Sequence, residues 1–410
     1  MSSSRFGTFP RSTNASPQAY KGLAVGLMLL SALLAVITFG HIVALAHRET
    51  LLDVGVFRDA GRAFLDGAPL YGEDFPTRSG FAFIYPPFAA LLFVPLTTTP
   101  EFAMDIIWSL SIIGCVFLIL GMACHRMGLR PWWMWAAGLT GFAMSFDPIY
   151  MNLHYGQINI FLILLVAMDV LGYTPKPIRG LGIGVAAGIK ITPAAYAVIF
   201  LVRKDWWSVA RAAGFFLLTV AIGFAVRPGA SKYFWTEEFF ATDRGGAPGY
   251  PPNQGLSGLL VRGGLDADTV ASFSPLILLI FAALSIYIAY RLEQHGRRVE
   301  SLLVVVLGIA IGGPFAVSHH WAGVVLVLPV ILAVKEHGMR LLLMLFAGAI
   351  IAPAYNLYVE QDSYHFSWPL WLNGNLIGIT GLGIMVAYFV LVTWFLDTPN
   401  IKKASPPVTS

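Results

Sequence analysis

The loop between the first two long apolar runs, His47 to Phe88, gathers side chains that can do chemistry. Only 12% of the chain is charged, yet this loop carries Asp53, Arg58, Asp59, Arg62 and Asp66. A carboxylate can act as a general base, and a guanidinium group can bind an anion through paired hydrogen bonds. The loop is therefore either a solvated connection or part of a site, and its place relative to a membrane distinguishes the two.

The charges of this loop divide into two groups by their spacing. Asp59, Arg62 and Asp66 stand at i, i+3 and i+7 of an expected amphipathic helix, so Arg62 can pair with either acid. Asp53 stands apart in the N-cap position of that helix, where its carboxylate could bind the first backbone N–H groups. On these residues alone, a helix cap and a functional carboxylate are equally good interpretations of Asp53.

Two other short segments place polar side chains between apolar runs. Lys190 follows Gly182–Ile189 and precedes Ala194–Val202, so a hairpin with Lys190 at its tip would reach about mid-bilayer, roughly 13 Å along a helix. A lysine at that depth is costly unless it meets an anion, although in an ordinary span it could snorkel to an interface. His319 and His320 also lie between apolar runs, and their rings can donate hydrogen bonds to anionic oxygens or orient a carboxylate.

The composition indicates an integral membrane protein. With 57% hydrophobic residues and a mean hydropathy of +0.71 over 410 residues, the chain has more apolar side chain than a soluble domain could bury. The net charge of +4 is spread through short loops, which excludes a nucleic-acid-binding face. Cysteines and histidines do not cluster at ligand spacing, and the acids of the loops form no pair typical of a metal site, so we predict neither a metal nor a cofactor.

The apolar runs and the basic clusters together predict the topology. Long runs recur from Gly22–Ala46 to Asn375–Leu396, as expected of an all-α polytopic protein with about 10–12 transmembrane helices. Two further segments, Phe81–Thr97 and Leu181–Val202, are interrupted by prolines or by Lys190. If both enter the membrane without crossing it, every basic cluster falls on the side of the basic N-terminus. We therefore expect cytoplasmic termini in the cell membrane and an extracytoplasmic face that carries the long polar loops.

A single domain accounts for most of the chain. Residues 1–20 are polar and basic and predict a disordered cytoplasmic tail, and residues 398–410 predict a second cytoplasmic tail. Residues 21–397 form the polytopic domain, with juxtamembrane helices in an extracytoplasmic loop at 47–101 and a further such loop at 227–270. The first apolar run is about twice as long as the core of a signal peptide, which favours an uncleaved signal anchor.

Short motifs in chain order resemble the C-superfamily of glycosyltransferases, and more narrowly glycosyltransferase family 87. The matching stretches are Asp53–Gly61, Pro69–Tyr71, Ile84–Phe88, Gly156–Asn159, Gly188–Pro193, Asn253-Gln254 and Ser318–Trp321. The resemblance implies a glycosyltransferase of the C-superfamily fold that acts outside the cytoplasm. It further implies an inverting α-mannosyltransferase with polyprenyl-phosphate-mannose as lipid-linked donor. The implied acceptor is a glycolipid, a phosphatidylinositol mannoside extended through an α-1,2 linkage.

That chemistry assigns roles to the polar residues. Inverting transfer from a lipid phosphate needs a general base near the acceptor hydroxyl and positive charge near the departing phosphate. We expect Asp53 to be the base, with His319 as a second catalytic residue. Lys190, His320 and Arg62 are expected to bind the donor phosphate. Neutral amides suit sugar hydroxyls and an indole face suits sugar stacking. The residues expected to bind the sugar or acceptor are Gln157, Asn159, Asn253, Gln254 and Trp321.

Other interpretations of these residues stay open. A transporter or flippase of a lipid-linked sugar could use Lys190, Asp169 and the histidines, although no internal repeat stands out. A non-catalytic envelope scaffold is a second alternative, and a sister transferase acting on lipomannan or using arabinofuranose is a third. Each amide has loop or helix capping as its alternative role. Asp147 is a further carboxylate, more often a cap or turn residue than a base.

Overall fold

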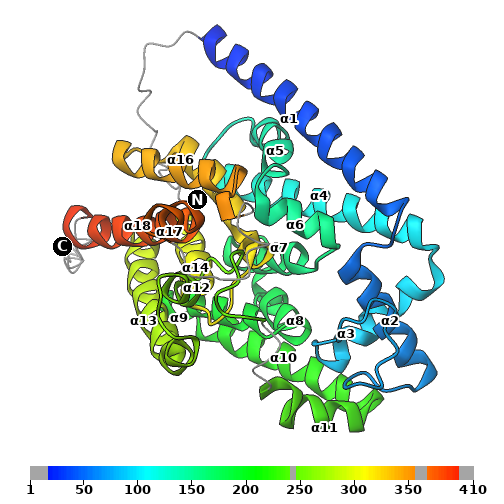
Figure 1. Ribbon diagram of the computed structural model, residues 1–410. Coiled ribbons are helices and arrows are strands. Elements are labelled where there is room, and N and C mark those ends of the chain that lie inside the picture. The colour runs from blue at the N-terminus through cyan, green and yellow to red at the C-terminus, as the bar shows by residue number, and fades with distance from the viewer. Residues whose placement is uncertain (1–16, 241–245, 356–366, 397–410) are drawn as a thin grey trace, which may run out of the picture.

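The computed structural model describes residues 17–240, 246–355 and 367–396, and every regular element in these ranges is a helix (Figure 1). Five of these helices are long and apolar enough to cross a membrane. The spanning stretches are Val25–Ala46 in α1 (Pro17–Ala46), α4 (Glu101–Arg126), α10 (Trp206–Val226), α13 (Ala267–Gln294), and α18 (Leu376–Val390) with its continuation η8 (Leu391–Phe395). The prediction of an all-α polytopic membrane protein is therefore confirmed. Of the predicted tails at 1–20 and 398–410, residues 1–16 and 398–410 lie outside the described residues, whereas residues 17–20 belong to α1.

The other apolar runs form shorter or interrupted helices. The apolar run Pro131–Tyr150, for example, is divided between two helices, and Pro148 lies in the first turn of the second one, where proline is tolerated. These elements are α5 (Trp132–Ala143), α6 (Asp147–Tyr155), α7 (Asn159–Val170), α14 (Arg298–Gly312), η6 (Ser318–Leu326), α15 (Val327–Ala333), α16 (His337–Ile351) and α17 (Trp368–Gly374). An apolar run thus marks a membrane-embedded segment without fixing one continuous helix.

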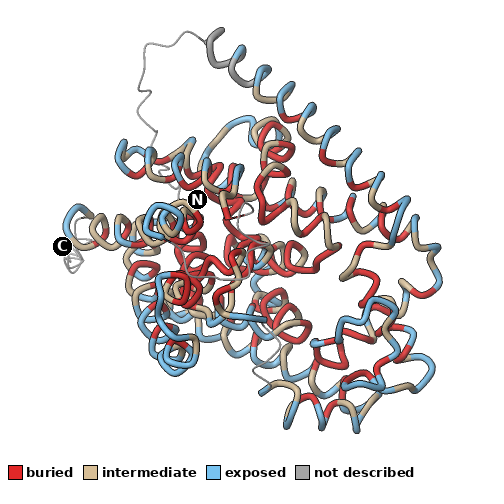
Figure 2. The backbone as a smooth tube through the Cα atoms, in the orientation of Figure 1, coloured by how far each residue is buried: buried red, intermediate tan, exposed pale blue. Residues whose placement is uncertain are grey.

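The outer helices carry their apolar side chains on the outside, as expected of a surface that contacts lipid. Buried residues concentrate in the middle of the bundle, while α1 and α13 are largely exposed along their length (Figure 2). Helix α1 packs against α5 through small residues: Ser31 Oγ donates to the Ala137 carbonyl and accepts the Gly141 N–H. Hydroxyls and glycines of this kind let helices approach closely in a membrane, where burial of apolar surface gives no driving force.

A group of short helices covers one end of the bundle (Figure 1). They are α2 (Leu52–Asp66), α3 (Pro87–Phe93), η1 (Val94–Thr98), α11 (Pro228–Thr236) and η4 (Glu238–Phe240). Helix α12 (Leu256–Arg262) packs against α13 and α14 instead. Helix α2 packs so closely on α3 that a Cβ on Gly61 would lie 2.6 Å from the Phe93 carbonyl oxygen. The loop at 47–101 is therefore a packed layer and not a loose connection.

The segment 181–202 forms a hairpin, as its charge pattern predicted. It consists of α8 (Leu181–Ile189), η3 (Thr192–Ala197) and α9 (Val198–Val202), and the preceding turn is η2 (Lys176–Ile178). Arg179 before the segment and Arg203 after it line the same cavity, so the chain enters and leaves at one end of the bundle. Lys190 lies at the opposite end of α8, at the tip.

Candidate active site

Five residues from distant parts of the chain meet in one hydrogen-bonded group, here called the polar cluster: Asp53, Gln157, Asn159, Lys190 and His319. Oδ2 of Asp53 accepts a hydrogen bond of 2.7 Å from Nε2 of Gln157. Nδ2 of Asn159 donates to Oε1 of Gln157 at 3.2 Å, and Nζ of Lys190 donates to Oδ1 of Asn159 at 3.0 Å. The carbonyl of His319 accepts from Nδ2 of Asn159 at 3.3 Å. Two amides thus connect a carboxylate to an ammonium group.

Asp53 does not cap a helix, contrary to its local interpretation. Helix α2 begins at Leu52, so the N-cap is Leu51 and Asp53 is the second helical residue. No side chain caps this end, and the Asp53 carboxylate is bound by Gln157 from a different part of the chain. Its negative charge is still favourable in the first turn because the backbone N–H groups point toward it. The interpretation of Asp53 as a helix cap is therefore wrong.

Contacts at both ends of α2 fix the position of Asp53. The Leu51 N–H donates to the buried Asp105 carboxylate of α4 at 3.3 Å. At the other end, the Arg227 guanidinium group donates to the carbonyls of Ala63 and Phe64 at 3.2 and 3.0 Å, which satisfies acceptors that a helix end leaves free. The start of α2 is thus held by a membrane-spanning helix and its end by the residue that follows α10.

Gly156 permits close contact between α2 and the turn before α7. Its φ of +70° is in the left-handed region, and a Cβ there would lie 2.8 Å from Val54 Cγ1. Only glycine adopts this conformation and fits this space without strain. Because Gln157 is the next residue, the close approach at Gly156 brings the Gln157 amide to Asp53.

The remaining loop charges form a separate network that differs from the predicted one. Asp59 is buried and pairs with Arg78 at 2.9 Å, and Arg78 also contacts Glu101. Glu101 accepts from Arg58 at 2.6 Å. Arg62 is exposed, and it lies nine residues after Asp53, which places it on the opposite face of α2. The predicted pairing of Arg62 with Asp59 is wrong, and its predicted phosphate contact has no support in this arrangement.

Burial changes the acidity of Asp53. Loss of hydration raises the pKa of Asp53 to about 6, although the Lys190 charge and the Gln157 hydrogen bond both act to lower it. A pKa near the working pH combines a sizeable ionised fraction with useful basicity, which suits a general base. The carboxylate lies in the first turn of a short helix at the end of the bundle and is partly exposed.

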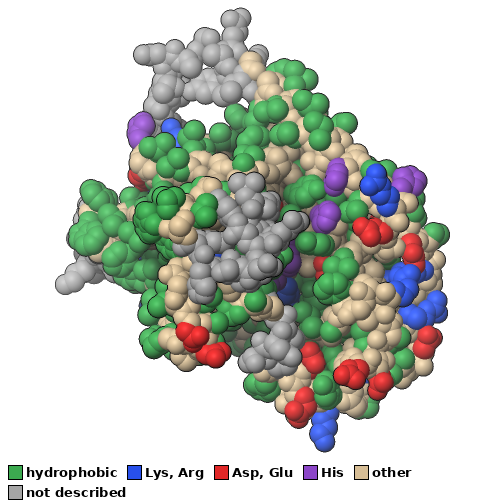
Figure 3. All heavy atoms as spheres, viewed as in Figure 1, with side chains coloured by type: hydrophobic (Ala, Val, Ile, Leu, Met, Phe, Trp, Pro, Cys, Tyr) green, Lys and Arg blue, Asp and Glu red, His purple; other side chains and the backbone are tan. Residues whose placement is uncertain are grey.

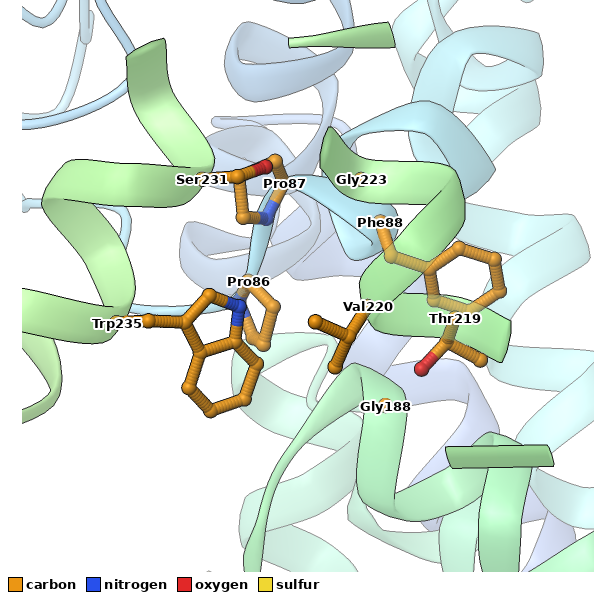
Figure 4. A pocket seen from close by; sticks show the side chains of 9 residues that line it. All are labelled: Pro86, Pro87, Phe88, Gly188, Thr219, Val220, Gly223, Ser231 and Trp235. Atoms are coloured by element: carbon orange, nitrogen blue, oxygen red, sulfur yellow. The ribbon is translucent and has the colours of Figure 1, made fainter. Parts of the chain in front are cut away.

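Lys190 is held at its place by a close contact behind it. A Cβ on Gly188 would lie 2.0 Å from Thr219 Oγ1 of α10, so the end of α8 packs against that helix without a side chain between them. Figure 4 shows Gly188 and Thr219 at the wall of a narrow, mostly apolar crevice, with Pro86 and Trp235 at its other side. Nζ of Lys190 lies 5.7 Å from the centre of the Tyr85 ring, within cation–π range.

His320 adjoins His319, the histidine of the polar cluster. Their rings lie 4.6 Å apart, the His319 ring faces Tyr155 at 6.1 Å, and the Lys190 charge acts on both. His320 is exposed. Figure 3 shows charged side chains gathered over the side of the molecule that carries α2, α3 and α11. The preceding Ser318 donates to Asp147, which also accepts from Tyr355. Asp147 therefore supports the histidine segment.

Three predicted sugar-binding residues have other roles. Asn253 and Gln254 are buried and use both amide atoms on the backbone: Asn253 binds Pro248 and Ala316, and Gln254 binds Pro251 and Gly378. Both amides are thus committed to backbone partners. Trp321 is fully buried, and its indole N–H donates to the Ala316 carbonyl at 3.0 Å. Since no face of the ring is exposed, it cannot stack on a sugar.

The sequence pattern did not identify the residues that hold other site residues in position. Asn152 lies in α6, and its Nδ2 donates to the His319 carbonyl at 3.0 Å, which ties the histidine segment to the amides. Its spacing of seven residues from Asn159 was the available signal, because amides recurring near a predicted turn can converge. Asp105 and Arg227 gave no such signal, since their partners are backbone groups. Among the described residues no group of histidines, cysteines and acids suits a metal ion.

Comparison with known proteins agrees with this geometry. Residues 83–318 match the model of glycosyltransferase family 87, a range that includes Gln157, Asn159 and Lys190 and ends next to His319. In Mycolicibacterium smegmatis, a polyprenol-phosphate-mannose-dependent alpha-(1-2)-phosphatidylinositol mannoside mannosyltransferase is 32% identical over 327 residues, 72% of this chain and 73% of the relative. The Mycobacterium tuberculosis protein of that name is 30% identical over 75% of this chain and 76% of its own length.

A third relative carries a related name. It is a polyprenol-phosphate-mannose-dependent alpha-(1-2)-phosphatidylinositol pentamannoside mannosyltransferase of Mycolicibacterium smegmatis, 33% identical over 60% of this chain and 59% of the relative. The family match covers more than half of the chain, and the first relative covers more than two thirds of it at over 30% identity. The chain is a membrane enzyme that belongs to glycosyltransferase family 87.

Proposed function

We propose that this enzyme transfers mannose from polyprenyl-phosphate-mannose to a phosphatidylinositol mannoside through an α-1,2 linkage, on the extracytoplasmic side of the cell membrane. The observation that carries the proposal is the polar cluster, in which one carboxylate and one ammonium group are joined by two amides. A base and a cation joined in one group suit the two ends of a displacement reaction. The names of the relatives support the donor and the acceptor class.

In the proposed reaction, the carboxylate of Asp53 accepts the proton of the acceptor hydroxyl. The hydroxyl oxygen forms a bond to the anomeric carbon as the bond from that carbon to the phosphate oxygen breaks, with inversion at the carbon. The leaving lipid phosphate keeps the electron pair and gains negative charge, which Lys190 stabilises. No second carboxylate is needed, because no covalent sugar intermediate forms and the lipid phosphate departs as an anion that needs no general acid.

The other members of the cluster have supporting roles in this proposal. Gln157 and Asn159 hold Asp53 and Lys190 at a fixed separation and, once substrate displaces part of the network, can donate to sugar hydroxyls. His319 and His320 lie beside Lys190 and can donate to phosphate oxygens. Arg62, Asn253, Gln254 and Trp321 take no part in the proposed mechanism, because Arg62 lies on the far face of α2 and the other three are buried.

A membrane assay with labelled polyprenyl-phosphate-mannose and a phosphatidylinositol mannoside tests the proposal. Asp53→Asn should lower the yield of extended glycolipid by about 100-fold or more, because general-base catalysis contributes that much. Asp66→Asn is the matched control, since Asp66 is an exposed acid at the far end of the same helix. Donor movement across the membrane without new glycolipid would contradict the enzyme and favour the transporter. Mass spectrometry of the product separates acceptors that differ in mannose number.

Sidedness needs its own experiment. The native cysteines Cys115 and Cys124 are buried, so a cysteine introduced at an exposed position reports with little background. Arg62→Cys should react with a membrane-impermeant maleimide in intact cells, and Lys176→Cys should react only after the membrane is permeabilised. The reverse pattern would overturn the proposed orientation while leaving the chemistry of Asp53 untouched.

A further inference from the structure

A cavity lined mainly by charged side chains lies at the end of the bundle opposite the polar cluster. It has a volume of about 590 Å³. Helix α7 leads from Asn159 to this end over 12 residues, roughly 18 Å along the axis. Four basic residues line this cavity, here called the arginine pocket: Arg179, Arg203, Lys204 and Arg298.

Three guanidinium groups converge on one backbone position at its edge. A Cβ on Gly172 would lie 3.1 Å from a terminal nitrogen of Arg126, 3.7 Å from one of Arg298 and 3.8 Å from one of Arg179. Like charges at this separation repel one another unless an anion lies between them. Burial and the charge of Arg203 lower the pKa of Arg298, Glu293 acts to raise it, and the charges of Arg126 and Arg179 lower it further.

The two acids of the pocket, Asp205 and Glu293, offset the charge of its four basic residues only in part. Glu293 is taken by Arg203, which binds both of its oxygens at 2.7 and 2.8 Å. Asp205 is the N-cap of α10 and accepts from Ser208. In the described part of the chain, Arg298 forms no hydrogen bond or ion pair, and the buried Nε of Arg179 has no partner. Positive charge and unused donors therefore remain on the wall of the pocket.

The positive-inside rule explains why basic residues gather on this face, but not why their hydrogen-bond donors converge around one cavity.

Aromatic residues indicate the depth of the pocket relative to the membrane. Trp206 and Trp207 follow Asp205 directly and are 63% and 77% exposed, as expected of indoles in the headgroup region. Trp132 and Trp133, exposed as well, begin α5 close to Arg126. The opening of the pocket thus lies at the level of lipid headgroups.

We propose that the arginine pocket binds the phosphate-bearing headgroup of an anionic phospholipid. The headgroup phosphate would lie between Arg179 and Arg298, where planar guanidinium groups can each donate two hydrogen bonds to phosphate oxygens. Basic pockets between membrane helices recognise anionic headgroups by this chemistry. The level of the tryptophans favours a lipid over a soluble phosphate compound as the source of the anion.

The position of the pocket connects it to the active end of the molecule. Arg179 precedes α8 and Arg203 follows α9, so a bound headgroup contacts both ends of the hairpin whose tip carries Lys190. Glycine packing at Gly188 already makes that hairpin rigid near its tip. An anion at its base removes the repulsion that would otherwise push the two ends apart. Lipid at the arginine pocket is therefore expected to stabilise the position of Lys190.

Native mass spectrometry of the purified full-length enzyme tests the proposal. The protein is mixed with phosphatidylglycerol, which is anionic, or phosphatidylcholine, which has no net charge, and retained lipid is counted. Wild-type enzyme should retain one phosphatidylglycerol in preference to phosphatidylcholine. Arg179→Gln with Arg298→Gln should weaken this retention about 30-fold, from roughly a fivefold contribution of each basic residue near a headgroup. Equal retention by this double variant would overturn the proposal.

The control removes two charges from the same face but not from the pocket. Arg130→Gln with Lys176→Gln should retain phosphatidylglycerol as the wild type does, since both residues are exposed and neither lines the cavity. If this control loses lipid to the same extent, the effect is one of general surface charge and the pocket is not a site. Inorganic pyrophosphate tests a soluble ligand. If pyrophosphate stabilises the enzyme and phosphatidylglycerol is not retained in preference to phosphatidylcholine, the assignment of the pocket to a lipid is overturned.

A single substitution keeps the proposal testable if the double variant does not fold. Lys204 lines the pocket, is exposed, and has a φ of 58°, a left-handed conformation that asparagine tolerates better than most residues. Lys204→Asn should therefore keep the thermal stability of the wild type. It should lower phosphatidylglycerol retention about fivefold. Unchanged retention in this folded variant would count against the pocket even if the double variant could not be purified.

Discussion

Nε2 of Gln157 donates a hydrogen bond of 2.7 Å to Oδ2 of Asp53, across 104 residues of sequence. This bond joins the layer of short helices to the start of α7, and through Asn159 it continues to Lys190. The Gln157 amide therefore sets both the position of the carboxylate and, by favouring its ionised form, its acidity.

Gln157→Leu should impair catalysis by releasing Asp53. A hydrogen bond to a charged group contributes about 1.5–3 kcal/mol, so kcat/KM should fall roughly 10- to 100-fold. Because the bond lowers the pKa of Asp53, its loss should also move the acid limb of the pH profile to higher pH. A merely structural role for Gln157 would lower activity equally at every pH. Measuring the profile of wild type and variant in the same membranes separates the two outcomes.

The activity of the wild type should depend on the ionisation of Asp53. With a pKa of about 6, kcat/KM should be level above pH 7 and should fall about tenfold per pH unit well below pH 6. Asp53→Asn should lack this limb in its residual activity. A wild-type profile that stays level down to pH 4.5 would exclude a buried carboxylate base of this acidity.

The same raised pKa has a consequence for stability. The folded protein holds the Asp53 proton more tightly than an unfolded chain with a pKa of 3.8, so ionisation favours unfolding. As pH rises from about 4 to about 6, this group's contribution to the free energy of unfolding is lost, by up to about 3 kcal/mol. Asp53→Asn should therefore raise the melting temperature at pH 7.5 and leave it unchanged at pH 4. A lower melting temperature at pH 7.5 would contradict the assigned environment.

The sequence predicted those features that depend on local order. The apolar runs placed the membrane, the interruption at Lys190 predicted a hairpin tip, and the turn Gly156–Asn159 marked a polar segment at a helix start. Each of these follows from neighbours along the chain. The structure then brought Lys190, Asn159 and Gln157 together with Asp53, which sequence order alone does not require.

The sequence could not assign partners, because partners lie far apart in the chain. Arg62 stands at helical spacing from Asp59, yet the buried Asp59 pairs with Arg78, 19 residues away, which is brought back by the loop between α2 and α3. Asn253 and Trp321 are residue types that suit sugars, but burial commits their polar atoms to backbone groups. Residue type predicts what a side chain can do, and packing determines whether it is available.

Gly188 should tolerate no side chain. In Gly188→Ala the new Cβ would lie 2.0 Å from Oγ1 and 2.5 Å from Cβ of Thr219, so either α8 or α10 must shift. Overpacking of this kind costs about 1–3 kcal/mol, and a shift of α8 displaces Lys190. Thr219→Gly removes the obstructing atoms and should restore part of both stability and activity to the double variant. Additive effects in the double-mutant cycle would show that the two residues do not touch.

Arg78 and Arg62 offer a direct test of which arginine stabilises the loop. Arg78→Ala leaves the buried Asp59 carboxylate without its 2.9 Å partner and removes one cation from Glu101. Loss of a partner from a buried charge can cost 3–5 kcal/mol, but Arg78 is itself half exposed, so we expect about 1–2 kcal/mol. Arg62→Ala should change the free energy of unfolding by less than about 0.5 kcal/mol, as for other exposed substitutions. Thermal unfolding of the two variants in detergent decides between the pairings. A larger loss of stability in Arg62→Ala would restore the pairing of Arg62 with Asp59 that helical spacing predicts. A loss of stability confined to Arg78→Ala would show that the contacts among Asp59, Arg78 and Glu101 stabilise the charged loop, separately from Asp53 in the polar cluster.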